Sequence, residues 1–374
     1  MNVVIAIDSF KGSLSSLEAG EAVKEAFLRR HKAGVAVVRP LADGGEGTVD
    51  AMALGLGGEI VRVSVSGPLG EKVEAKYCVV NGTVAVIEMA EAAGITLVPP
   101  NKRDPRFTTT FGVGELIKCA IKRGCRSFIV GIGGSATNDG GAGMLSALGF
   151  DLLDKNGNRI AAGAKGLESL ASISAKNVMP ELSECSFRVA CDVSNPLCGE
   201  RGCSAVYGPQ KGATPESVNT MDKALMKYAA ITKSVFPDAD PDYPGAGAAG
   251  GLGFAFRSFL GASLESGVNI ILEETELEKH IADADLVVTG EGRLDSQTVM
   301  GKAPIGVARL AKKHGKRVIA FAGCVTDDAE ICNDNGIDAF FPIIRGITTL
   351  DEALKKETAY KNLSATAYQV FGLL

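Results

Sequence analysis

The sequence predicts an α/β protein in which the N- and C-terminal segments build one flavodoxin- or Rossmann-like parallel sheet, with a second, α+β domain inserted between them. Three observations lead to this prediction. Short apolar runs alternate with helical patterns at both ends of the chain. The middle of the chain instead alternates apolar and polar residues, which is typical of antiparallel hairpins. A chain of 374 residues is also too long for one ordinary hydrophobic core.

The first 40 residues have the pattern of a strand, a helix and a second strand. An apolar run at 2–7 ends in Asp8 and predicts a buried parallel strand. A serine-rich stretch at 12–16 offers N-caps for a helix that we expect to run to residue 30. Another apolar run, at 35–38, predicts the second strand.

The C-terminal segment repeats this order of strand and helix. A helix that ends in basic residues suits the helix dipole and follows a strand pattern there. The predicted strands are 284–288, 318–322 and 338–341, and the predicted helices are 303–313, 327–333 and a last one from residue 350.

The middle segment has a different character. Its predicted strands are 60–65, 72–79 and 84–89, joined by turns at 66–67 and 81–82, and its predicted helices are 111–122 and 214–231. These patterns predict one domain made of 1–62 with 285–374, and an inserted domain at 63–284. Two sequential domains divided near residue 150 are the alternative arrangement.

Composition excludes several classes of function. The formal net charge is −5 and the pI is about 5.5, without the basic patch that binds nucleic acid. No secretion signal and no run of 18 apolar residues is present, so we expect a cytoplasmic protein without a membrane segment. The nine cysteines form no CxxC pair and are expected to be reduced. Oligomeric state is not readable from the sequence, and a homo-oligomer stays open.

Carboxylates and glycines follow the first two predicted strands. Asp8 and Lys11 come directly after the first strand, and Asp43 and Glu46 flank two glycines after the second. Open α/β sheets bind ligands at the carboxyl ends of their strands. Carboxylates placed there can bind Mg²⁺ or accept a proton. A glycine-rich strand-to-helix turn with a capping Asp explains 43–48 equally well.

The densest set of polar donors lies at 133–141, after a predicted strand at 128–131. A glycine-rich loop that runs into a helix N-terminus is a ready anion site. We therefore predict that this loop binds phosphate, with an Asx-rich turn and a cap as the alternative. The predicted binding residues are Gly133, Gly134, Ser135, Thr137, Asn138 and Asp139.

Two further strand ends carry charged residues. Asp192 follows a predicted strand at 187–191 and suits a base or a metal ligand, although an Asx-turn before Pro196 fits it almost as well. Glu291, Arg293 and Asp295 follow the strand at 284–288. The planar fork of Arg293 can bind a carboxylate or a phosphate, and a surface ion pair is the alternative.

Several motifs are absent or out of context. The sequence has neither a Walker loop nor the protein-kinase motifs, and only three histidines, so a Ser-His-Asp triad is not expected. A GxGxxG run at 245–250 follows prolines where a dinucleotide site needs a strand, so we expect a close-approach loop instead. The remaining Asp, Glu, Gly, Ser, Thr, Lys and Arg suit phosphoryl transfer.

With these motifs the chain resembles the bacterial glycerate kinase family. The resemblance rests on 8–12, 43–48, 133–141, 191–197, 245–253 and 289–295. It implies ATP and Mg²⁺ as co-reactants and (R)-glycerate as acceptor, with 2-phosphoglycerate as the usual product. It also implies a flavodoxin-like domain with a second α/β domain inserted, and a cytoplasmic setting.

On this reading we expect the active site in the cleft between the two domains. The expected catalytic residues are Asp192, Asp8, Lys11 and Asp43, with Asp192 as the favoured base and Asp43 and Asp192 as metal ligands. Glu46, Glu291, Arg293 and Asp295 are expected to bind substrate or phosphate together with the 133–139 loop. The alternatives are a glycerate 3-kinase, a non-catalytic module that senses hydroxy acids, and an NAD-linked dehydrogenase.

Overall fold

The computed structural model describes residues 1–42 and 47–374, which form two compact units. The first unit contains Met1–Asp43, Asp50–Gly57 and Val268–Leu374, and the second contains Gly44–Val49 and Gly58–Gly267. The boundaries predicted from the sequence lie further along the chain, after 62 and after 284. The difference arises at the second boundary because helices α10 (Gly267–Glu274) and α11 (Leu277–Ala282) belong with the first unit, where α11 packs on the next helix.

The first unit is built on a five-stranded sheet with the order β13-β12-β11-β1-β2. The strands are β1 (Asn2–Ile5), β2 (Val35–Val38), β11 (Leu286–Leu294), β12 (Arg317–Val325) and β13 (Ala339–Pro342). Every neighbouring pair is parallel. Counted along the chain the order is 2-1-3-4-5, which is the flavodoxin order. The prediction that the two ends of the chain share one parallel sheet is confirmed.

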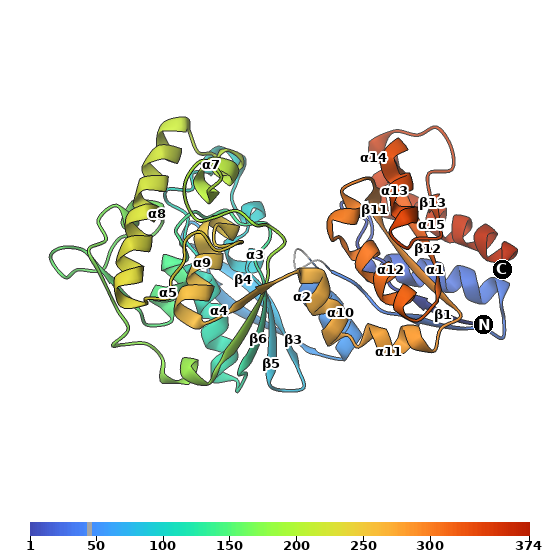
Figure 1. Ribbon diagram of the computed structural model, residues 1–374, viewed down its shortest axis with the longest axis horizontal. Coiled ribbons are helices and arrows are strands. Elements are labelled where there is room, and N and C mark those ends of the chain that lie inside the picture. Colours follow the sequence, from blue (N-terminus) through green and yellow to red (C-terminus); the bar gives the residue numbers. More distant parts are fainter. Residues whose placement is uncertain (43–46) are drawn as a thin grey trace. The chain divides into compact units, whose positions relative to one another are not determined.

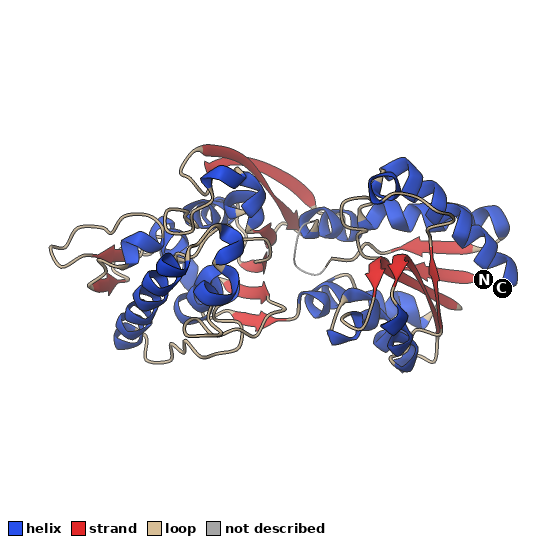
Figure 2. Ribbon diagram, turned by 90° about the horizontal axis from the view of Figure 1, so that it is seen from above, coloured by secondary structure: helices blue, strands red, loops and turns tan. Residues whose placement is uncertain are grey.

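Helices cover both faces of this sheet (Figure 2). On one face, α1 (Ser16–Arg30) and α15 (Lys356–Val370) bury apolar side chains against Ile5, Val288 and Phe321. Helix α12 (Ala303–Lys313) packs beside β11. Helices α2 (Thr48–Leu56), α13 (Ile331–Asp334) and α14 (Leu350–Leu354) complete the unit. Helix α1 begins where the serine-rich stretch predicted, because Ser15 and Glu18 form a capping box.

The second unit contains a mixed six-stranded sheet with the order β10-β9-β6-β5-β4-β3. Its strands β3, β4, β5 and β6 are labelled in Figure 1. Its strands are β3 (Glu59–Ser66), β4 (Lys72–Val80), β5 (Val84–Glu88), β6 (Ser127–Gly131), β9 (Ser186–Ala190) and β10 (Ser263–Glu265). Strands β3, β4 and β5 are antiparallel, as their alternating residues predicted. Strands β5, β6, β9 and β10 are parallel, so their carboxyl ends meet at one edge.

Short helices and one long helix surround this sheet. They are α3 (Ala90–Ala93), α4 (Phe111–Lys122), α5 (Ala142–Ala147), α6 (Ala164–Leu167), α7 (Cys203–Tyr207), α8 (Pro215–Val235) and α9 (Ala248–Leu260), with a small hairpin of β7 (Asp151–Leu153) and β8 (Ser172–Ser174). Within the described residues, no helix is both long enough and apolar enough to span a membrane.

The glycine run at 245–253 packs against the 133–141 loop. Gly250 has a φ of +69°, and a Cβ placed on it would lie 2.1 Å from the carbonyl oxygen of Thr137. The carbonyl of Gly250 accepts a hydrogen bond of 2.9 Å from the amide of Gly140. Only glycine fits this contact without a shift of backbone, so the run has a packing reason that needs no dinucleotide.

A buried serine joins the loops that follow β1 and β2. The hydroxyl of Ser16 donates to the carbonyl of Ile7 at 2.5 Å and accepts from the amide of Leu41 at 2.7 Å. Replacing Ser16 with Ala leaves the Leu41 amide without this acceptor. We expect the free energy of unfolding of the first unit to fall by about 1–3 kcal/mol. Urea denaturation, combined with hydrogen–deuterium exchange of the 35–42 peptide, measures this effect.

Ser13 provides the matched control. Its hydroxyl is buried without a hydrogen-bond partner among the described residues. Ser13→Ala removes an unsatisfied group and should leave stability unchanged or slightly raised. Equal losses for Ser13→Ala and Ser16→Ala would show that the bridge is not what stabilises these loops.

Candidate active site

The first candidate site lies at the carboxyl edge of the parallel sheet of the first unit. The strand order changes direction between β1 and β11, and open α/β sheets bind ligands in the crevice at such a point. Asp8 follows β1, and its amide donates to the carbonyl of Gly290 in β11 at 2.9 Å. The structure therefore brings Asp8 beside the segment that carries Glu291, Arg293 and Asp295.

Strand β11 is longer than the sequence predicted. We expected a strand that ends at 288 and a loop at 289–295, but the strand continues to Leu294. The reason is its pairing with β12, in which Arg293 and Leu294 lie opposite Cys324 and Val325. Side chains alternate along a strand, so Glu291 and Arg293 point to the same side of the sheet. Glu291 and Arg293 are thus held by regular structure.

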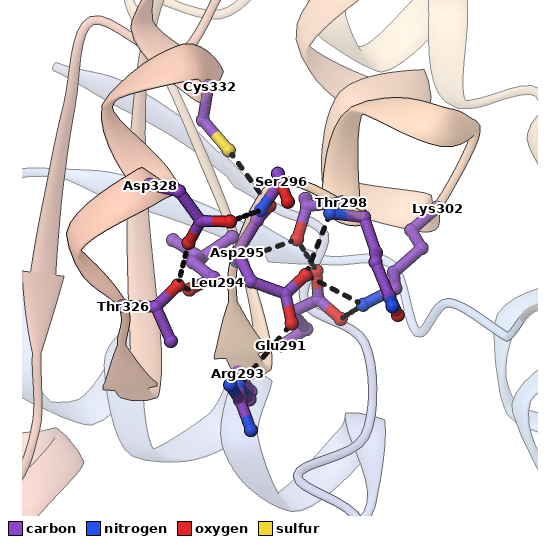
Figure 3. Close-up of polar contacts among 11 residues, drawn as sticks. Glu291, Arg293, Leu294, Asp295, Ser296, Thr298, Lys302, Thr326, Asp328 and Cys332 are labelled. Atoms are coloured by element: carbon purple, nitrogen blue, oxygen red, sulfur yellow. Dashed lines mark hydrogen bonds and ion pairs between the residues drawn. The ribbon is translucent and has the colours of Figure 1, made fainter.

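A polar network fixes the two carboxylates of this segment (Figure 3). The Thr298 hydroxyl donates to Glu291 Oε1 at 2.8 Å and accepts from the Asp295 amide at 3.3 Å. Lys302 Nζ lies 3.4 Å from Glu291 Oε2 and 3.6 Å from Asp295 Oδ1. Burial raises the pKa of Glu291, against the opposing effect of Thr298 and Lys302. One ammonium is therefore shared by two carboxylates.

Arg293 and Lys11 are the cations that face solvent here. Arg293 Nε lies 3.3 Å from Asp295 Oδ2, so the ion pair considered from the sequence is present. Its side chain is still 62% exposed, which leaves guanidinium N–H groups accessible to an anion. Lys11 is exposed in the turn after β1, and its amide lies 3.4 Å from a Cβ built on Gly292. Binding of a substrate anion by either residue stays a prediction.

Three members of this network were not singled out from the sequence: Thr298, Lys302 and Asp328. Asp328 accepts from the Ser296 amide at 3.2 Å and from the Thr326 hydroxyl at 2.5 Å. Hydrogen bonds from the side chains of Ser296 and Thr326 are the main causes that lower the pKa of Asp328 to about 2, and the Ser296 amide contributes less. Asp328 thereby holds the segment after β11 (Figure 3). Its position after the carboxyl end of β12 was the signal that could have identified it.

The second candidate site lies at the carboxyl ends of β5, β6 and β9. These strands are adjacent and parallel, so Glu88, the 133–141 loop and Asp192 start from the same edge of the sheet. Asp192 is exposed and its Oδ1 accepts from the Gly267 amide at 3.2 Å. Glu88 is buried and its Oε1 accepts from the Val49 amide at 2.7 Å.

Most of the 133–141 loop is buried. Gly133 and Gly134 are exposed, whereas the side chains of Thr137, Asn138 and Asp139 are fully buried. The side-chain amide of Asn138 donates through Nδ2 to the hydroxyl of Ser204 at 2.8 Å. Contact of these three side chains with a ligand stays a prediction, and the exposed part of the loop is its glycine pair.

Asp139 organises the loop from inside. Its carboxylate accepts from the amide and the hydroxyl of Thr110, both at 2.9 Å, and from the amides of Gly141 and Gly143 at 3.1 and 3.2 Å. Burial raises the pKa of Asp139, and these four donors oppose that effect. Asp139 thus uses amides at the start of α5 that a bound anion would otherwise need. These are the contacts of the turn-and-cap alternative.

Lys211, in the segment after α7, also contacts this loop. The ammonium lies 2.7 Å from the Ser135 hydroxyl and 2.7 Å from the Thr137 carbonyl. Burial lowers the pKa of Lys211 to about 8. A buried lysine therefore supports the strand end from which Gly133 and Gly134 protrude.

Of the two predicted metal ligands, Asp192 lies within the described residues and Asp43 does not. Asp43 and Glu46 lie outside the described residues. Among the residues at 1–42 and 47–374, no group of three or more His, Cys, Asp or Glu side chains is placed to hold a metal ion. A Mg²⁺ site formed by the protein together with substrate phosphates stays a prediction.

Comparison with known proteins gives matches along both units. A model described as the glycerate kinase family matches residues 3–374. The chain is 48% identical to glycerate 2-kinase of Escherichia coli (strain K12), covering 100% of this chain and 98% of the relative. It is 46% identical to glycerate kinase of Bacillus subtilis (strain 168), covering 98% and 96%. A crystal structure from Salmonella typhimurium LT2, assigned as glycerate kinase 2, matches with a TM-score of 0.90 at 48% identity, covering 100% and 98%.

The buried carboxyl of Glu88 should make stability depend on pH. Burial raises its pKa from 4.5 to about 7. The folded state therefore binds this proton more tightly than the unfolded state, and the resulting stability is present below pH 4.5 and lost as pH rises to 7. Relative to wild type, Glu88→Gln should gain on the order of 2–3 kcal/mol in free energy of unfolding between pH 4.5 and 7.5.

Urea denaturation at several pH values checks this expectation. Glu216→Gln is the control, because Glu216 is an exposed carboxylate of the same unit. Its difference from wild type should stay constant over the interval. A Glu88→Gln difference that is equally constant would contradict the assignment of a proton to Glu88 near neutral pH.

Proposed function

Because the chain belongs to the glycerate kinase family, we propose that it transfers the γ-phosphate of ATP to (R)-glycerate and releases 2-phosphoglycerate and ADP. The observation that carries the proposal is the cluster on β11, in which Glu291 and Asp295 share Lys302 while Arg293 faces solvent. Phosphoryl transfer needs positioned cations and a carboxylate more than covalent chemistry. The family supplies the acceptor, and the relative from E. coli, a glycerate 2-kinase, favours the C2 hydroxyl.

The cations bind the negative charges of the reactants in this proposal. Arg293 uses its accessible N–H groups for the glycerate carboxylate or the transferred phosphoryl group, and Lys11 contributes a second positive charge. Lys302 stays between its two carboxylates and keeps Asp295 oriented toward Arg293. The guanidinium of Arg293 thus has its Nε side paired with Asp295, and its exposed N–H groups can bind a substrate anion.

A carboxylate removes the proton of the reacting hydroxyl. We propose Asp192 for this role, because its side chain is exposed at a strand end and one oxygen is oriented by the Gly267 amide. The glycerate oxygen forms its bond to the γ-phosphorus as the bond to the bridging oxygen of ADP breaks. The proton passes to Asp192, and ADP leaves with the electron pair.

Mg²⁺ is proposed as the co-reactant ion. Mg²⁺ prefers oxygen ligands and is commonly bound by one or two carboxylates together with substrate phosphates. We propose Asp192 and Asp43 as these carboxylates. When bound, it neutralises charge on the phosphates of ATP. We propose that the reaction takes place in the cytoplasm.

The product identifies the reaction. We expect protein, ATP, Mg²⁺ and (R)-glycerate to yield a phosphomonoester on C2, seen by ³¹P and ¹³C NMR. A phosphate on C3 would keep the kinase and replace the proposed product with 3-phosphoglycerate. No phosphorylated product would remove (R)-glycerate as the substrate, and would leave a hydroxy-acid binding module to be tested by calorimetry.

Asp192→Asn tests the base. The substitution retains an oxygen near the Gly267 amide but removes the proton acceptor. We expect kcat to fall by about 10²-fold or more. A kcat close to wild type would remove Asp192 from this role.

Arg293→Met tests the anion clamp. Loss of a charge-assisted hydrogen bond to a substrate anion should raise KM for glycerate or ATP by roughly 10- to 100-fold. Arg317→Met is the matched control, because Arg317 is exposed at the opposite, amino end of β12. Steady-state kinetics with each substrate varied in turn distinguish the two anions, and equal KM values for both variants would reject the clamp.

A further inference from the structure

Lys211 is a buried cation that contacts the 133–141 loop through two oxygens. Its side chain is only 2% exposed, so it cannot itself touch a ligand at the surface of the unit. Its ammonium lies 2.7 Å from both Ser135 Oγ and the carbonyl oxygen of Thr137. The hydroxyl of Ser135 lies between this buried charge and the exposed glycine pair. Ser135 follows Gly134 directly in the chain and is 9% exposed.

The charge of Lys211 decides what the Ser135 hydroxyl can do. An ammonium group has three donors and no acceptor, so Ser135 Oγ must accept in this hydrogen bond. The proton of the hydroxyl is then directed away from Lys211 and is available to a second acceptor. A neutral amine, in contrast, has a lone pair that can accept this proton. Protonated Lys211 therefore makes Ser135 an outward donor, which is the polarity that an anion needs.

We propose that Lys211 is a positioning residue that orients the Ser135 hydroxyl toward an anionic oxygen of a reactant bound at Gly133–Ser135. The assignment rests on the proposed function, in which both reactants are anions. The location is supported by the exposed glycine pair at the carboxyl end of β6, where open α/β sheets bind ligands. The shared chemistry is an oxyanion, either a phosphate of ATP or the glycerate carboxylate.

The surroundings of Lys211 keep this arrangement sensitive to pH. The ionisable groups around it are Asp139 in the loop and Cys203 in α7, and Arg103 packs against the next residue, Gly212. Asp139 and Cys203 favour the charged ammonium, but burial outweighs them and lowers the pKa of Lys211 to about 8. The carboxylate of Asp139 is already bound by four donors of the loop and of Thr110.

A pH profile of the wild-type enzyme and two variants tests the proposal. We expect kcat/KM of the wild type to decrease above pH 8, because kcat/KM reports the ionisations of the free enzyme. A bound anion stabilises the ammonium, so the same decrease in kcat should lie at higher pH. Both Lys211→Met and Ser135→Ala should lack the decrease near pH 8. A decrease that persists in Ser135→Ala would overturn the proposal, even if Lys211→Met fails to fold.

A double-mutant cycle separates positioning from a merely structural role. Each single variant should raise KM for one reactant by about 10-fold or more, and the double variant should raise it little further, since both remove the same donor. A rise for ATP identifies the phosphate, and a rise for glycerate identifies the carboxylate. Effects that multiply in the double variant would show that Lys211 acts independently of Ser135 and would reject the proposal.

Matched controls are available in the same unit. Ser146 donates to the helix carbonyl of Ala142, and Lys227 is exposed and donates to the carbonyl of Glu168. Ser146→Ala and Lys227→Met should leave KM and the pH profile unchanged. If no phosphorylated glycerate is formed by the wild type, thermal shift with tripolyphosphate and with glycerate still tests the anion site. Loss of either shift in Ser135→Ala and Lys211→Met supports the proposal, and equal shifts in all variants reject it.

Discussion

The parallel pairing of β1 with β11 is the interaction on which the first unit depends. It joins Val3, Val4 and Ile5 to the first residues of β11, far along the chain. The entropic cost of closing a loop grows only with the logarithm of its length. A very long connection between β1 and β11 therefore costs little more to close than a short one. A whole second unit can therefore lie between the two strands. The same pairing brings Asp8 beside Gly290, and thus joins the loop after the first strand to the charged residues of β11.

Local patterns in the sequence were sufficient for most elements of the fold. The alternation in β3, β4 and β5, the apolar runs of the parallel strands and the serine cap of α1 all depend on neighbours close in the chain. What local patterns could not supply was pairing between distant segments. Strand β11 continues to Leu294 because β12 offers it a partner, and glycines at 290 and 292 concealed that continuation. The unit boundary near 267 likewise depends on packing.

The segments that carry the candidate sites could be predicted from the sequence. The roles of individual residues within them could be predicted less well. The density of donors predicted a binding site at the 133–141 loop, and ligand binding there stays a prediction. The structure shows that Asp139 of this loop itself accepts from the Gly141 amide and from Thr110, 29 residues earlier in the chain. The contacts of Lys211 and Lys302 could not be predicted from the sequence. They depend on the burial of Lys211 and on the two carboxylates next to Lys302, and residue spacing reveals neither. The family resemblance, confirmed by the family match over 3–374, supplied the reaction. Without the resemblance, the residue types in the sequence indicated only the class of reaction, phosphoryl transfer.

The strand order also determines when each sheet can be completed during synthesis of the chain. Strand β1 is synthesised long before its neighbour β11 and the covering helix α15. At about 5–20 residues per second, β1 waits roughly 15–60 s for Leu286 to be added. The second unit has all six strands of its sheet between Glu59 and Glu265 and can complete them during this interval. The nascent chain therefore contains the complete sheet of the second unit while the apolar strand β1 still lacks its partner β11.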